Sequence, residues 1–154
     1  MIALKDALAR NPNNFLGAIK NIPRKLLLMY VHAFQSLLWN KSVEEYLRLN
    51  SNISEKEEIP LIGFSTETAP EKEGIISALL KEEGLTKRDF ILRDFPELSL
   101  EGNSRKIFME INDIKVSSYE DDDLNLGKKK VVVRFFLEKG AYATMAVKQM
   151  MGNK

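Results

Sequence analysis

The spacing of apolar residues is helical up to about Gly102 and alternating beyond it. From Arg24 to Leu49, apolar side chains recur every three or four positions in one wide stripe. This pattern predicts a single long helix over 24–49, about 39 Å in length at roughly 1.5 Å per residue. The width of the stripe indicates that this helix is the central element of a helical region.

Shorter helices are expected on either side of this element. Residues 15–19 place their apolar side chains on one face, and Asn11 is a suitable cap for that helix. A second helix is predicted over 71–84, where Gly84 provides a C-terminal stop. Thr86 is expected to cap a further short helix that follows directly.

The alternating part of the sequence predicts β-structure. Residues 105–119 and 128–137 alternate apolar and polar positions, which is typical of strands. The acidic loop 120–127 between them is expected to be a solvated hairpin tip, because it lacks the ligand spacing and glycine turn of a calcium loop. A last helix is predicted over 140–151.

These elements predict an α+β fold with a domain boundary at Gly102. The first part, 1–102, is mostly helical, and the second, 103–154, holds an antiparallel strand pair and a C-terminal helix. Apolar residues occur on both faces of the strand over 131–137. That strand is therefore expected to lie inside a larger sheet, since an isolated strand pair is marginal in water.

Composition excludes several kinds of site. The 154 residues include no cysteine and one histidine, which excludes disulfide scaffolds, thiolate zinc sites and His-rich metal centres, so no metal is expected. No apolar run approaches the roughly 20 residues that span a bilayer, so no membrane is expected and the cytoplasm is the expected location. The formal net charge of +1 argues weakly against a dedicated nucleic-acid binder.

Some basic and aromatic residues are nevertheless candidates for contact with a nucleic acid. Arg24 and Lys25 start the long helix, and Lys128–Lys130 start the second strand. Such residues are equally common on plain surfaces, and a lysine run often protects a strand edge. Tyr142 is expected either to pack in a core or to stack on a base. The lone His32 is expected to be structural and at least half-buried.

Two longer motifs give the sequence a family resemblance. The first reads Ile-Pro-Arg-Lys at 22–25, Met-Tyr-Val-His-Ala-Phe-Gln-Ser at 29–36 and Trp-Asn at 39–40. The second reads Phe-Phe-Leu-Glu-Lys-Gly-Ala-Tyr-Ala-Thr-Met at 135–145. Together they resemble a helix and the C-terminal signature of the TruD family of tRNA pseudouridine synthases. The segments between them follow the family's order over nearly the whole chain.

The resemblance implies a reaction and a pocket. Members of the family convert one uridine of an RNA, usually a tRNA, to pseudouridine without a cofactor. An aspartate attacks, and the base detaches, rotates and rejoins through carbon. The target base must leave its stack, so the pocket needs an aromatic platform. By position in the motif that platform is Tyr142, and Gly140, Ala143 and Thr144 shape the turn beside it.

The resemblance also implies a domain assignment. The helix over 30–40 resembles part of a helical insertion domain of the family, so 1–102 is expected to be a partial insertion domain. The segment 103–154 is then the C-terminal piece of the catalytic domain, and its strands belong to the pseudouridine-synthase catalytic sheet. RNA-binding side chains would form a local basic rim, with Arg24, Lys25, Arg105, Lys128, Lys129 and Lys130 as candidates.

The sequence departs from the family at the catalytic residue. The family's nucleophilic aspartate lies in a Gly-x-Lys-Asp motif that this sequence does not contain, and Asp6 is only a superficial echo of it. Glu138 stands where the family prefers proline. We assign no catalytic residue and expect a C-terminal part of a synthase that is inactive alone and needs the missing aspartate-bearing segment. The part is either a split or truncated product or a fragment, and a companion chain is one possible source of that segment.

Two alternatives stay open. The first alternative to a partial synthase is a non-catalytic RNA-binding or assembly module that kept the family scaffold. The second is a self-sufficient α+β protein without a role on RNA. The apolar strand over 131–137 argues against the second alternative, because it is patterned for burial.

Overall fold

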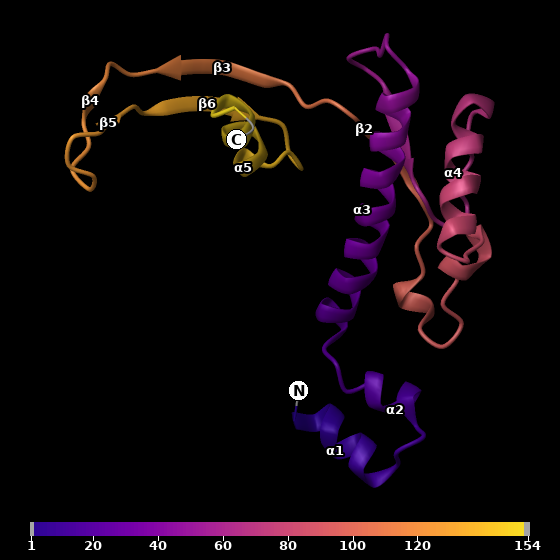
Figure 1. The fold of residues 1–154 in the computed structure, drawn as a ribbon. Helices are drawn as coiled ribbons and strands as arrows, with labels where there is room; N and C mark the ends of the chain where they lie inside the picture. Colours follow the sequence, from indigo (N-terminus) through magenta and orange to yellow (C-terminus); the bar gives the residue numbers. More distant parts are fainter. Residues whose placement is uncertain (1, 153–154) are drawn as a thin grey trace. The chain divides into compact units, whose positions relative to one another are not determined.

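The computed structural model describes residues 2–152. The chain forms two compact units, one ending at Ile107 and the other beginning at Phe108. The first unit holds a long helix and its neighbours, and the second holds a strand ribbon and a short helix (Figure 1). Helices and small antiparallel sheets together confirm the predicted α+β class.

Two short helices come first, α1 (Ile2–Arg10) and α2 (Phe15–Ile19). The prediction that Asn11 caps α2 is wrong. The cap is Asn14, whose side-chain oxygen accepts the Gly17 backbone N–H at 2.9 Å. Asn11 cannot serve because its own N–H still donates to the Ala7 carbonyl of the preceding helix at 3.0 Å. A cap residue must leave helical backbone geometry, and the chain does so one turn later.

The long helix α3 (Arg24–Leu49) has the predicted bounds. Pro23 precedes it, and its carbonyl accepts the Leu26 N–H at 2.8 Å. The buried positions follow a spacing of three or four and form one narrow face: Gln35, Leu38, Ser42 and Tyr46. Many of its other apolar side chains are exposed, among them Met29, Tyr30, Phe34 and Leu37. Only this narrow face of the wide apolar stripe on α3 is therefore buried against the rest of the first unit, among the described residues.

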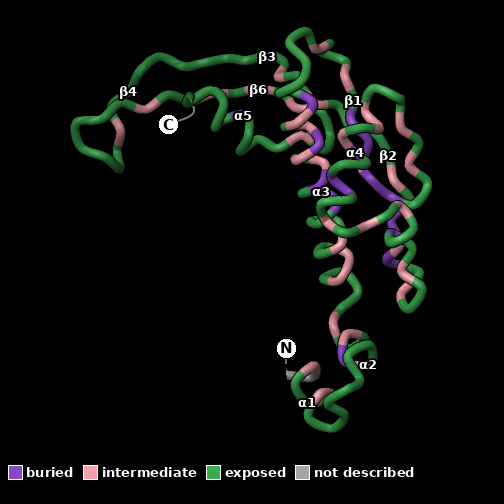
Figure 2. The backbone as a smooth tube through the Cα atoms, turned by 45° about the vertical axis from the view of Figure 1, so that its right-hand side comes forward, coloured by how far each residue is buried: buried purple, intermediate pink, exposed green. Residues whose placement is uncertain are grey.

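The core of the first unit lies between α3 and α4 (Pro70–Glu82), which confirms the predicted second helix. Its buried cluster comprises Leu38, Ile62, Ile76, Leu79, Leu80, Phe90 and Leu100. Burial of one such side chain contributes about 1.5–3 kcal/mol. In Figure 2 the buried positions gather on α3, α4 and their strand neighbours, whereas the ribbon of the second unit is mostly exposed.

Two short 3₁₀ helices close the side of this core. The first, η1 (Lys87–Phe90), follows Thr86 as predicted. Its capping box joins Thr86 and Asp89, with the Thr86 N–H donating to the Asp89 carboxylate at 2.7 Å. The second, η2 (Pro96–Leu98), begins at a proline, whose missing N–H is not needed in a first turn.

A two-stranded sheet borders α3. Strand β1 (Glu58–Leu61) pairs antiparallel with β2 (Asn103–Lys106), which brings Ile59 opposite Arg105. Just beyond this strand pair, the backbone at Gly63 lies close to the backbone of residues 100–102. A Cβ at Gly63 would lie 2.3 Å from the backbone nitrogen of Gly102, so only glycine permits this approach.

The second unit is built on an antiparallel ribbon. Strand β3 (Ile111–Val116) pairs with β6 (Val133–Leu137), and the register shifts where Asp113 has a φ of 52°. Strands β4 (Glu120–Asp121) and β5 (Lys129–Lys130) form a second short pair. Helix α5 (Ala143–Met150) follows β6 and buries Ala146.

The break between the compact units lies after Ile107, beyond the boundary predicted at Gly102. Asn103–Lys106 belong to the first unit because they pair with β1, and the Ile107 N–H continues this pairing to the Glu57 carbonyl at 2.9 Å. The predicted strand over 105–119 is therefore two strands with different partners. Alternation indicates that a segment is extended, but it does not show which strand pairs with it.

Candidate functional site

The loop between β6 and α5 carries Tyr142. Gly140 in this loop has a φ of 97°, a conformation that glycine adopts freely and that other residues adopt at a cost. The Tyr142 carbonyl accepts the N–H groups of Met145 at 3.0 Å and Ala146 at 3.2 Å, so its backbone is fixed by the first turn of α5. Tyr142 is 67% exposed. It does not pack in a core of the described residues.

Ala143 and Thr144 are the first two residues of α5, and both are exposed. The four residues singled out by the motif, Gly140, Tyr142, Ala143 and Thr144, thus lie on one turn. An aromatic ring that is held at a helix start and open to solvent can stack on an unpaired base. This turn is the candidate site of the second unit.

The lysine run lies at the other end of β6, on a hairpin with acidic residues. Lys129 Nζ lies 2.5 Å from Asp121 Oδ1, and Lys130 pairs with Asp123. Among the described residues, Lys128 forms no ion pair. Exposed pairs of this kind contribute at most about 1 kcal/mol, so both lysines can exchange their partner for a phosphate group.

Asp122 organises the tip of this hairpin. Its carboxylate accepts the Leu124 backbone N–H at 2.9 Å and the Asn125 side-chain amide at 2.7 Å. These hydrogen bonds favour the charged carboxylate and lower the pKa of Asp122. Over the described part of the chain, no three His, Asp or Glu side chains gather as metal ligands. The acidic run therefore acts as a turn.

Arg24 and Lys25 are the first two residues of α3, and both are exposed. The first turn of α3 carries no acidic side chain. Its free backbone N–H groups add positive potential, which favours an anion there. The prediction that His32 is at least half-buried is wrong, because this residue of α3 is exposed.

Arg105 belongs to the first unit, and its guanidinium carbon lies 5.2 Å from the centroid of the Trp39 ring. Trp39 lies on α3, about 22 Å along the helix from Arg24 at roughly 1.5 Å per residue. The basic candidates of the first unit thus form two separate sites. In the second unit, the Lys128–Lys130 hairpin and the Tyr142 turn lie at opposite ends of β6.

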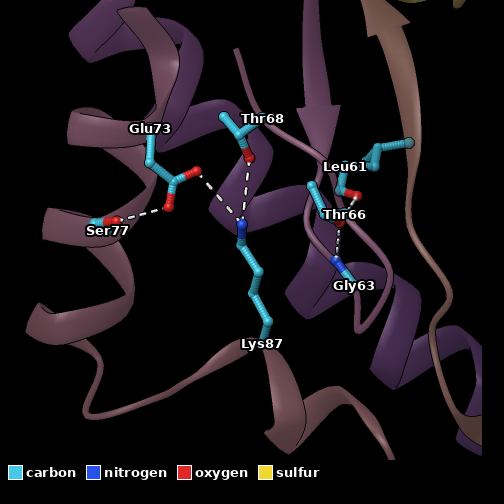
Figure 3. Close-up of polar contacts among 7 residues, drawn as sticks. All are labelled: Leu61, Gly63, Thr66, Thr68, Glu73, Ser77 and Lys87. Carbon is cyan, nitrogen blue, oxygen red and sulfur yellow. Dashed lines mark hydrogen bonds and ion pairs between the residues drawn. The ribbon is translucent and has the colours of Figure 1, made fainter. Parts of the chain in front are cut away.

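Figure 3 shows a polar cluster that the sequence pattern did not predict. Lys87 Nζ lies 3.4 Å from both the Glu73 carboxylate and the Thr68 hydroxyl, and the Ser77 hydroxyl donates to Glu73 at 3.0 Å. These groups lower the pKa of Glu73, with the Ser77 hydrogen bond as the largest cause. The cluster joins α4 to η1, and its polar groups bond to one another, so we interpret it as structural.

An apolar cavity of about 330 Å³ lies on the same unit between α3 and η1. Aromatic and aliphatic side chains line it, among them Tyr30, Phe34 and Phe90. Asp89 is the one ionisable carboxylate among its lining residues, and hydrogen bonds from the backbone and side chain of Thr86 lower its pKa. These hydrogen bonds are those of the capping box, so Asp89 serves the start of η1.

Across residues 2–152, none of the helices has the length and apolar character needed to cross a membrane. This finding is in line with the charged residues distributed along α3, which include Lys41, Glu44, Glu45 and Arg48.

The comparison with known proteins covers almost the whole chain. The profile of the family described as "tRNA pseudouridine synthase D (TruD)" matches residues 3–59 and 55–150. A Methanopyrus kandleri protein named "Probable tRNA pseudouridine synthase D" is 28% identical over 160 residues, which cover 97% of this chain and 38% of the relative. A Methanocaldococcus jannaschii protein named "Probable tRNA pseudouridine synthase D 2" is 30% identical over 167 residues, which cover 91% of this chain and 39% of that relative.

The fold is similar as well. A Methanosarcina mazei protein, whose crystal structure is described as that of a tRNA pseudouridine synthase D (TruD), matches with a TM-score of 0.77 and 26% identity. The match covers 97% of this chain and 43% of that protein. The chain spans about two fifths of the length of the relatives it matches, 38% and 43% of the first two. On the family match over most of its length, the chain belongs to the TruD family of tRNA pseudouridine synthases.

Proposed function

We propose that this chain takes part in the isomerisation of a uridine in tRNA to pseudouridine, as the C-terminal part of a TruD-type synthase. The observation that carries the proposal is the family match over 3–59 and 55–150, which includes both recognised motifs. A companion segment with the family's Gly-x-Lys-Asp motif supplies the nucleophile, since the sequence has no such motif. The cytoplasm is the proposed location.

In this proposal Tyr142 is the platform for the uridine. The base leaves its stack and lies against the exposed Tyr142 side chain, whose backbone carbonyl is hydrogen-bonded into the first turn of α5. The companion aspartate attacks and the bond between N1 and the ribose breaks. A bond from C5 to the ribose then forms as the aspartate is released as a free carboxylate. The hydrogen on C5 is lost as N1 gains one, so the base keeps its composition and no cofactor is consumed.

The two units are proposed to act in different ways. The first unit is proposed as a partial insertion domain that contacts the tRNA backbone through Arg24, Lys25 and Arg105. The second is proposed as a piece of the catalytic sheet. Support for this comes from β6, where Phe136 is 61% exposed while Val133, Phe135 and Leu137 are only partly covered, a pattern that suits burial on both faces.

A turnover measurement with the purified chain tests the proposal. tRNA labelled with tritium at uridine C5 loses the label when C5 joins the ribose, so released tritium counts turnover. We expect no release by the chain alone and tRNA binding that weakens steeply with salt, by a factor of about 10 to the power 0.9 per contacted phosphate for each tenfold rise in salt. Release by the chain alone would contradict the assignment of the nucleophile to a companion segment.

A non-catalytic RNA-binding or assembly module is the second candidate function. The absence of the Gly-x-Lys-Asp motif from the sequence is the observation in its favour. Tyr142 distinguishes the two functions, because a module has no need of a platform for an unstacked uridine. If replacement of Tyr142 leaves the binding of tRNA containing 5-fluorouridine unchanged, even in the presence of the companion segment, the module is favoured.

A further inference from the structure

Among the described residues of the first unit, two cations lie over aromatic rings, and one of these two forms an ion pair. Lys72 Nζ lies 5.7 Å from the Tyr46 ring centroid and 2.6 Å from Glu57 Oε1, and its side chain is 15% exposed. Arg105 lies 5.2 Å from the Trp39 ring and is exposed. Among the described residues, no carboxylate lies within ion-pair distance of Arg105.

The Trp39 ring is held in one orientation. Its indole N–H donates to the Ile59 carbonyl at 2.9 Å, and Ile59 is 2% exposed. Ile59 is also the β1 residue directly opposite Arg105 in the strand pair. Buried Ile59 thus accepts the hydrogen bond that orients the Trp39 ring. The strand partner of Ile59 is Arg105, whose guanidinium lies over that ring.

This arrangement sets the guanidinium in place before any ligand binds. A guanidinium on an aromatic face has its five N–H donors at its rim, in one plane. Such a fork matches two oxygens of a phosphate group, and prior orientation reduces the entropy lost on binding. A cation that served only to stabilise the fold would gain more from an acidic partner, as Lys72 does from Glu57.

The surroundings of Arg105 suit a polyanion. β2 is one of two strands in its sheet, and all four of its residues, Asn103, Ser104, Arg105 and Lys106, are exposed. Lys106 adds a second positive charge on the strand, with Glu58 as its opposite neighbour in register. Exposed hydrogen-bond donors next to two cations are the usual composition of a contact with a nucleic-acid backbone.

We propose that Arg105, stacked on Trp39, binds a phosphodiester group of the RNA backbone, with Trp39 as the positioning residue. The identity of the polyanion as RNA rests on the proposed function. The site positions the RNA and carries no sequence information, since phosphate groups are the same at every nucleotide.

Trp39 also provides the test, because it is the only tryptophan of the sequence. The full chain is titrated with a tRNA transcript while Trp39 emission and the bound fraction on a filter are followed together. We expect the emission to change with the same midpoint as binding. Arg105→Lys keeps the charge but loses the fork and the flat stack, and it is expected to weaken binding about five- to tenfold.

Lys81→Ala is the matched control, since it removes a full charge from an exposed position on α4 of the same unit that takes no part in the proposed contact. Its expected effect is about twofold or less, as for an ordinary surface charge. Unchanged urea midpoints of both variants show that neither acts through folding. Binding of tRNA without a change in Trp39 emission, or an Arg105→Lys protein that binds as tightly as the wild type, would overturn the inference and leave the proposed function standing.

Two further outcomes separate the inference from its premise. If the wild-type chain does not bind tRNA at any salt concentration, the proposed function fails, and the inference fails with it. If poly-glutamate changes Trp39 emission at lower concentrations than RNA does, the site serves an acidic protein segment and the assignment to RNA is wrong.

Discussion

Replacing Gly63 or Gly74 by alanine is the same chemical change within one unit, yet we expect opposite effects on stability. A Cβ on Gly63 would lie 2.3 Å from the Gly102 backbone nitrogen and 2.5 Å from the Leu100 carbonyl oxygen, below the 3.0 Å that Cβ atoms tolerate. Both neighbours are backbone atoms, so the two chain segments must separate. On α4, no described atom lies within 4 Å of a Cβ added to Gly74.

The magnitude follows from the hydrogen bonds around Gly63. Separation breaks the bonds from the Phe64 N–H to the Leu100 carbonyl at 2.9 Å and from the Ser65 N–H to the Glu101 carbonyl at 3.0 Å. Each contributes about 1 kcal/mol, and overpacking costs about 1–3 kcal/mol more, so Gly63→Ala should lower the free energy of unfolding by about 3–5 kcal/mol. Gly74→Ala should raise it by about 0.5–1 kcal/mol, because alanine favours the helix and restricts the unfolded chain.

Urea unfolding followed by Trp39 emission measures both variants, since the only tryptophan lies in this unit. With an m-value of about 1–3 kcal/mol per molar urea, the two midpoints should differ by about 1 M or more. Coincident midpoints, or a Gly63→Ala protein as stable as the wild type, would refute the close approach of the two segments.

Three more predictions concern the second unit and the polar cluster. Tyr142→Ala should leave the free energy of unfolding within about 0.5 kcal/mol of the wild-type value, since Tyr142 is 67% exposed. It should lower pseudouridine formation by the completed enzyme at least about tenfold, and an unchanged rate would contradict the platform role. Lys128→Ala should make the salt dependence of tRNA binding shallower by about 0.9 in log–log slope, and Lys129→Ala by less, because Asp121 already neutralises it; equal slopes argue against this difference. Because the pKa of Glu73 is lowered, its contribution to stability is present above its ordinary pKa of 4.5 and is lost as pH falls through the lowered value. The urea midpoints of the wild type and of Glu73→Gln should therefore differ near pH 7 and converge in acid; a difference that persists in acid would contradict this linkage.

Helices were predicted well from the sequence because their signals are local. The period of apolar residues and the proline before it set the bounds of α3, and the turn at Gly84 and the Thr86 cap behaved as predicted. The failure at Asn11 is of the same local kind. Two asparagines three residues apart are equally good caps by residue type, and the hydrogen bonding of the preceding helix selects Asn14.

Long-range partners were not predictable from the sequence pattern. The alternation over 105–119 does not reveal that Arg105 pairs beside Ile59 while Ile111 pairs with Leu137. The stack of Arg105 on Trp39 depends on that pairing, so it was missed, and Arg105 was placed with the later strands. The Glu73–Lys87 cluster was missed for the same reason, since its members come from a loop, a helix and a 3₁₀ turn.

The candidate site was predictable where a motif fixed it. Gly140 and Tyr142 lie on one turn before α5, and the structure adds the positive φ of Gly140 and the exposure of Tyr142. The single basic rim predicted around that turn depends on contacts between elements far apart in the sequence. Within the first unit the structure instead separates the start of α3 from Arg105.

The most direct test of the central claim is reconstitution of pseudouridine formation. The purified chain is mixed with a segment that carries the family's Gly-x-Lys-Asp motif, and tritium release from C5-labelled tRNA is measured for the mixture, for each component alone, and for the mixture with that aspartate replaced by asparagine. The account predicts release by the intact mixture only. Release by this chain alone, or no release by a mixture that is shown to form a complex and to bind tRNA, would contradict it.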